Sequence, residues 1–135
     1  MPRLSVWMLR LSLLALFTGG LAGALVLGGF PPALVLAGRF RAMHLELMLF
    51  GWLVQFVLGV AYWILPRHAA GSERGSVALG WTAFGLFQAG IGLALIGEGG
   101  PAAEILVPAG RVLLVGAILL FVGLFVPRIK PFGTT

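Results

Sequence analysis

The stretch from Phe40 to Leu65, FRAMHLELMLFGWLVQFVLGVAYWIL, decides the fold of this protein. After Arg41 its only formally charged residue is Glu46, and leucine, valine, phenylalanine and tryptophan make up most of the rest. A helix of about 20 apolar residues crosses the ~30 Å hydrocarbon core of a bilayer. The stretch therefore predicts a transmembrane helix.

Three further apolar runs have a similar length, at residues 5–27, 77–96 and 105–126. Segments rich in glycine and proline separate the four runs, at residues 28–32, 66–71 and 97–101. With 60% hydrophobic and 10% charged residues, the chain of 135 residues is too apolar to bury its side chains as a soluble domain. We expect an all-α fold, a single four-helix integral membrane bundle over residues 1–135.

The basic residues flank these runs unequally. One side of the expected bundle carries Arg3, Arg10, Arg67, Arg74, Arg128 and Lys130, and the other carries Arg39, Arg41 and Arg111. Because positive residues favour the cytoplasmic side, both termini are expected there, in a bacterial or archaeal cytoplasmic membrane. The scattered flanking positions explain the net charge of +5 without a nucleic-acid partner. The length of the first run predicts a retained helix and not a cleaved signal peptide.

Polar and small residues form a stripe on the second run. At helical spacing His44, Met48, Gly51, Gln55 and Tyr62 share one face. Polar side chains inside hydrocarbon are costly and often functional. The His44 imidazole is compatible with a hydrogen bond to a neighbouring helix or with an axial bond to heme iron. In the second case Gly51 would leave room for the porphyrin, and Met48 is a candidate heme contact.

Other metals fit the composition less well. Zinc and copper sites need several converging ligands, whereas the chain has two histidines and no cysteine. His68 follows His44 by 24 positions, which is about 36 Å along a helix, so one chain cannot bring both to one iron. The sixth iron ligand would be His44 of a second copy, or Met43 or Met48, or the position would be open to a gas.

Charged residues near the outer end extend this prediction. Arg39, Arg41 and Arg111 are candidates for pairing with heme propionates, and interfacial anchoring is the alternative for each. Glu46 is expected on a different face from His44, where it could hydrogen-bond to an arginine. No buried charge pair is expected from the sequence.

The segment RFRAMHLELMLFGWLVQFVLGVAYWILPR, residues 39–67, resembles the second helix of the large subunit of heme-copper oxidases and nitric oxide reductases. The resemblance implies that His44 is an axial ligand of a low-spin heme. The histidines of that family's binuclear centre have no counterpart here, so reduction of dioxygen or nitric oxide is not expected. The implied protein is a homodimeric heme b cytochrome for electron transfer or for gas or redox sensing, alongside respiratory-chain proteins.

Two other functions stay open. A heme-free accessory or scaffold subunit of a respiratory complex would use the same helices for packing. A small oligomeric transporter would line its path with Gln55, Tyr62 and Gln88, but no inverted repeat supports it. The many glycines within the runs are expected to permit close helix packing: Gly19, Gly23, Gly80, Gly85, Gly90, Gly92, Gly116 and Gly123.

Overall fold

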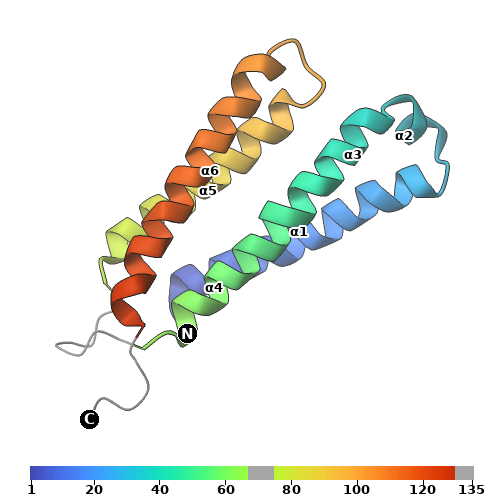
Figure 1. Ribbon diagram of the computed structural model, residues 1–135. Helices are drawn as coiled ribbons and strands as arrows, with labels where there is room; N and C mark the ends of the chain where they lie inside the picture. The colour runs from blue at the N-terminus through green and yellow to red at the C-terminus, as the bar shows by residue number, and fades with distance from the viewer. Residues whose placement is uncertain (67–74, 130–135) are drawn as a thin grey trace.

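The computed structural model describes residues 1–66 and 75–129 of the chain. Every regular element in these ranges is a helix (Figure 1): α1 (Arg3–Leu27), α2 (Pro31–Val35), α3 (Ala37–Glu46), η1 (Leu47–Val54), α4 (Gln55–Ile64), α5 (Val77–Gly97), α6 (Ala103–Phe125) and η2 (Val126–Arg128). The elements α3, η1 and α4 follow one another without a break and form one rod. Four helices are therefore long and apolar enough to cross a membrane, in agreement with the four expected runs.

Local signals explain where the helices begin and end. After α1, Gly29 adopts a φ of +72°, a left-handed conformation that glycine reaches without strain. Pro31 and Pro32 then open α2, because the first helical turn needs no proline N–H. At the start of α5 the Ser76 hydroxyl accepts a hydrogen bond from the Leu79 amide at 3.2 Å.

The helices pair into two antiparallel hairpins. The first hairpin contains α1 and the α3–η1–α4 rod, and the second contains α5 and α6 (Figure 1). The start of α1, the end of α4 and the end of η2 lie together at what we call the terminal end. The connections at residues 28–36 and 98–102 lie at the opposite, loop end, where the hairpins diverge in Figure 1.

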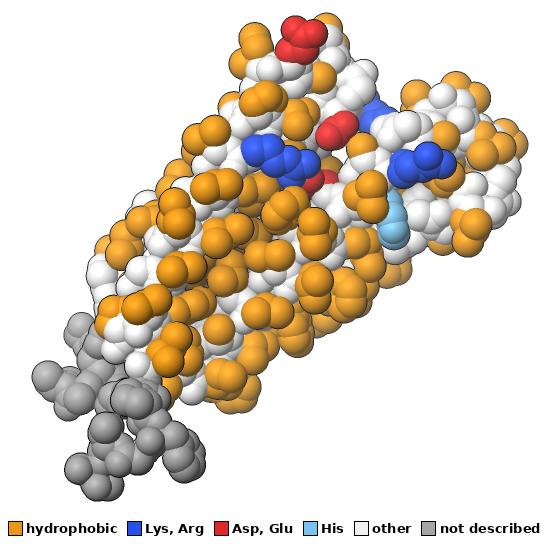
Figure 2. All heavy atoms as spheres, viewed as in Figure 1, with side chains coloured by type: hydrophobic (Ala, Val, Ile, Leu, Met, Phe, Trp, Pro, Cys, Tyr) orange, Lys and Arg blue, Asp and Glu red, His pale blue; other side chains and the backbone are white. Residues whose placement is uncertain are grey.

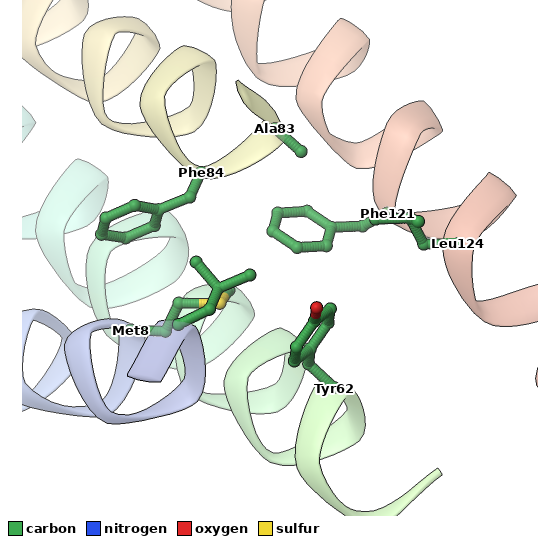
Figure 3. Close-up of a cluster of buried hydrophobic side chains, with 7 residues drawn as sticks. Met8, Tyr62, Ala83, Phe84, Phe121 and Leu124 are labelled. Atoms are coloured by element: carbon green, nitrogen blue, oxygen red, sulfur yellow. The ribbon is translucent and has the colours of Figure 1, made fainter. Parts of the chain in front are cut away.

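A core cluster joins the hairpins at the terminal end. It draws on α1, α4, α5 and α6 (Figure 3) and consists of Leu4, Met8, Tyr62, Ala83, Phe84, Phe121 and Leu124. Beside it, the buried Arg128 donates hydrogen bonds to the carbonyls of Tyr62 at 3.0 Å, Leu65 at 2.6 Å and Pro66 at 2.9 Å. These carbonyls lie at the C-terminal end of α4, where helix acceptors lack partners of their own. Arg128 thus fastens the fourth span to the second.

The outer surface has the character of a membrane protein. Large apolar side chains are exposed along all four spans, among them Phe17, Ile64, Leu79 and Val112. Figure 2 shows hydrophobic side chains along the shaft of the bundle, while charged ones gather near the loop end. A soluble protein does not expose apolar surface on this scale, whereas lipid is a suitable solvent for it.

The glycines divide into two groups. A Cβ atom at Gly19, Gly23, Gly80 or Gly90 would meet an atom of a neighbouring helix within 3.0 Å, so the predicted close packing is confirmed there. The prediction is wrong for a second group, where a Cβ atom would meet nothing within 4 Å: Gly85, Gly92, Gly116 and Gly123. Sequence alone cannot separate the two groups, because which face meets a partner depends on how the hairpins dock.

Candidate functional site

The second span contains a π-helical segment that the sequence analysis did not predict. Residues Leu47–Val54, at its centre, form η1 between the α-helical segments α3 and α4. A π-helical turn holds one more residue than an α-helical turn, so it rotates α3 by about 100° relative to α4. The exposed residues Leu45, Leu49, Leu53 and Val57 accordingly recur at every fourth position. Such segments are rare and frequently occur at functional sites.

His44 lies on α3 against α1. Its Nδ1 atom is 2.8 Å from the Gly19 carbonyl oxygen, so Nδ1 carries the proton and donates this hydrogen bond. The ring approaches α1 so closely that a Cβ atom at Gly23 would be 2.6 Å from Nδ1. The other ring nitrogen, Nε2, has no hydrogen-bond partner among residues 1–66 and 75–129. In a neutral imidazole one nitrogen would thus fix the ring, and the other would keep its electron pair.

A small pocket opens beside this ring. Its lining residues are Gly23, Val26, Leu27, Arg41 and His44, and its volume is about 190 Å³. The lining is almost entirely apolar except for the imidazole and the exposed Arg41 side chain. The volume is below the ~300 Å³ at which pockets for small organic ligands begin. One chain therefore offers part of a site, at the surface of the first hairpin.

Two of the predicted heme contacts face α1 and not this pocket. A Cβ atom at Gly51 would be 2.8 Å from the Ala15 Cβ atom, so no porphyrin fits against Gly51. The Met48 sulfur would lie 3.4 Å from a Cβ atom at Gly19, in the same helix contact. Met43, considered as an iron ligand, packs against a second core cluster, which consists of Ala15, Leu47, Phe87, Ile91, Leu114 and Ala117.

The three predicted arginines separate in the structure. Arg41 lines the pocket with His44, whereas the Arg39 side chain lies within 3.8 Å of a Cβ atom built on Gly99 in the α5–α6 connection. Arg111, on α6, reaches across to Glu46 on α3. Of the predicted site residues, the structure brings only His44 and Arg41 together at the pocket.

Glu46 and Arg111 form an ion pair between the two hairpins. Arg111 Nη1 lies 2.8 Å from Glu46 Oε1 and 2.6 Å from Oε2, and the guanidinium carbon is 5.2 Å from the Phe50 ring centre. The glutamate side chain is 4% exposed and the arginine side chain 42%. The expected hydrogen bond between Glu46 and an arginine is confirmed, with Arg111 as the donor. The expectation of no buried charge pair is wrong, because the glutamate of this pair is buried. A glutamate in an apolar run signals such a partner, but only the tertiary structure identifies it as Arg111.

A second polar bridge lies deeper in the bundle. Gln55 on α4 is fully buried, and its Nε2 donates to the Met8 carbonyl at 3.0 Å. Its Oε1 accepts a hydrogen bond from Gln88 Nε2 on α5 at 2.8 Å. In the transporter alternative both amides would line a path, whereas here they join three helices.

No metal site with several protein ligands is present in the described part of the chain, since it holds no group of three or more histidine, cysteine, aspartate or glutamate side chains. His68 lies outside the described residues. Comparison with protein-family models, curated proteins and solved structures finds no match to this chain. The resemblance of the second span to heme-copper oxidases therefore stays a prediction.

Proposed function

We propose that this protein is a membrane heme b protein in which His44 binds the iron, and that two copies of the chain share the heme. The observation that supports the proposal is the hydrogen bond that holds the His44 ring and the pocket that lies beside it. Nδ1 donates to the Gly19 carbonyl at 2.8 Å, and the His44 side chain also lines the small pocket beside α1. Histidines that bind metals usually donate their second ring N–H in this way, which fixes the tautomer and orients the ring.

The residues around the ring also suit a heme. Gly23 lacks a Cβ atom where one would collide with the imidazole, so the ring can stay close to α1. Arg41 can pair with a propionate, because its guanidinium matches a carboxylate and it lines the same pocket. Val26 and Leu27 supply the apolar wall. A heme bound here would provide one-electron redox chemistry or an open position for a gas.

The incomplete site explains the proposed dimer. A pocket of about 190 Å³ covers only part of a porphyrin, and a single imidazole supplies one axial ligand. A second copy related by a two-fold axis would add its own His44 and enclose the other face. With two histidine ligands the protein would transfer electrons, whereas an open sixth position would favour gas sensing.

The distribution of arginine and lysine along the sequence supports the proposed membrane orientation. In the sequence, six arginines and lysines lie in or near the N-terminal, middle-loop and C-terminal segments against three in or near the other two connections, which supports cytoplasmic termini in a bacterial or archaeal membrane, with His44 toward the opposite face. Respiratory-chain proteins in that membrane are the proposed electron donors and acceptors.

A pyridine hemochrome measurement on purified protein tests the proposal. Expression with ample heme should give one heme b per two chains, His44→Ala should abolish the Soret band, and the control His68→Ala should retain it. A colourless wild-type protein, or a Soret band unaltered by His44→Ala, would refute heme binding at this residue.

A heme-free scaffold is the second candidate, and one observation favours it. The hydrogen bond between His44 and Gly19 already ties α3 to α1, which is a sufficient structural use of a histidine within a membrane. Copurification of larger respiratory subunits with a colourless protein would support this function in place of the first.

A further inference from the structure

The second span is held by two polar anchors on either side of its π-helical segment. Above η1, Glu46 pairs with Arg111 of α6. Below it, Gln55 bonds to the Met8 carbonyl and to Gln88 of α5. Both anchor side chains are at least nine-tenths buried, and both reach the second hairpin.

A straight α-helix could not satisfy both anchors. Glu46 and Gln55 are nine positions apart, and at about 100° per residue they would point in opposite directions. The extra residue of a π-helical turn removes about 100° of this difference. The π form of Leu47–Val54 is thus the form that lets both side chains face the second hairpin.

We propose that the Glu46–Arg111 ion pair holds η1 in its π form and thereby positions His44 against Gly19 and Gly23. Glu46 and Arg111 are positioning residues, since neither lines the pocket beside the imidazole. The consequence for heme rests on the proposed function, whereas the positioning itself does not.

If the π form were lost, the residues of α3 would take one defined alternative orientation. If η1 became α-helical while Gln55 stayed in place, each residue of α3 would move to the angular position now held by the residue before it. Leu45 would replace His44 against α1, and position 46 would face lipid, where Leu45 is now 60% exposed. A buried glutamate paired with arginine opposes this change, while a leucine at position 46 favours it, because lipid accepts leucine readily and a carboxylate poorly.

Thiol labelling of the protein without heme tests the positioning directly, because the chain has no cysteine. In detergent solution, at a pH that favours the thiolate, the thiol introduced by Leu45→Cys should react with N-ethylmaleimide in the otherwise native chain, because position 45 is exposed and lies one turn from the exposed Arg41. Reactivity should be lost when Glu46→Leu is added and kept when Glu46→Gln is added, since glutamine still accepts a hydrogen bond from Arg111. Leu21→Cys is the control, because Leu21 lies on α1 and is 48% exposed. Its thiol should react equally in all variants.

The double variant Glu46→Leu/Arg111→Leu controls for misfolding caused by an unpaired arginine, because it removes both charges. Its thiol at position 45 should lose reactivity in the same way. Unchanged reactivity at position 45 in both leucine variants, with an unchanged control, would overturn the proposal. Heme titration of the same proteins separates the two proposals. Altered labelling in a chain that never binds heme would leave the positioning intact and remove the proposed function.

Discussion

Gly23→Ala is the most informative single substitution, because it acts on the His44 ring without removing any polar group. The new Cβ atom would lie 2.6 Å from Nδ1, and ordinary contact begins at 3.4 Å, so the ring must move by about 0.8 Å. A displacement of that size, directed away from α1, stretches the 2.8 Å hydrogen bond to Gly19 beyond the ~3.2 Å limit for an N–H···O bond.

The effects on stability and on heme binding should then differ. Losing the hydrogen bond costs about 1 kcal/mol, while replacing glycine by alanine within a helix gains about 1 kcal/mol, so the free energy of unfolding should hardly change. Heme affinity should fall by roughly 10–100-fold, the range found when a metal-binding histidine loses the partner of its other nitrogen.

The assay is a heme titration followed at the Soret band, with thermal unfolding in detergent as the stability measurement. Gly20→Ala is the matched control, because a Cβ atom there meets nothing within 4 Å on the same helix. The reasoning is refuted if Gly23→Ala binds heme as tightly as the wild type, or if Gly20→Ala weakens binding equally.

Two further predictions concern the bundle itself. Gln55→Leu should lower the free energy of unfolding by about 1–3 kcal/mol in a chemical denaturation series, because Gln88 loses its buried acceptor. Adding Gln88→Leu should restore most of this loss. A double variant as unstable as the single one would contradict the prediction. Gly90→Ala should destabilise the protein by about 1–3 kcal/mol, because its Cβ atom would lie 2.8 Å from the Gly110 backbone oxygen. Gly85→Ala places its Cβ atom in open space and should stabilise the protein by about 1 kcal/mol. Thermal unfolding of the two variants measures both effects.

The second span shows which features helical periodicity predicts and which it does not. The face predicted from helical spacing is largely the face toward α1, since His44, Met48, Gly51 and Gln55 all reach that helix. The π-helical segment escaped prediction because no single residue in LMLFGWLV requires it. It arises from two hydrogen-bonding side chains, nine positions apart, that must reach the same neighbouring hairpin.

The sequence by itself determined the four long apolar helices, because each run of about 20 apolar residues is long enough as a helix to cross a bilayer. It also determined that His44 and Glu46 needed partners, since isolated polar groups in hydrocarbon are too costly to leave unpaired. Only the tertiary structure decided that Gly19 bonds His44, that Arg111 pairs with Glu46, and that Arg41, of the three predicted arginines, shares the pocket with His44. The physical reason is that hydropathy acts locally along each helix, whereas partners are chosen by how two hairpins dock and rotate.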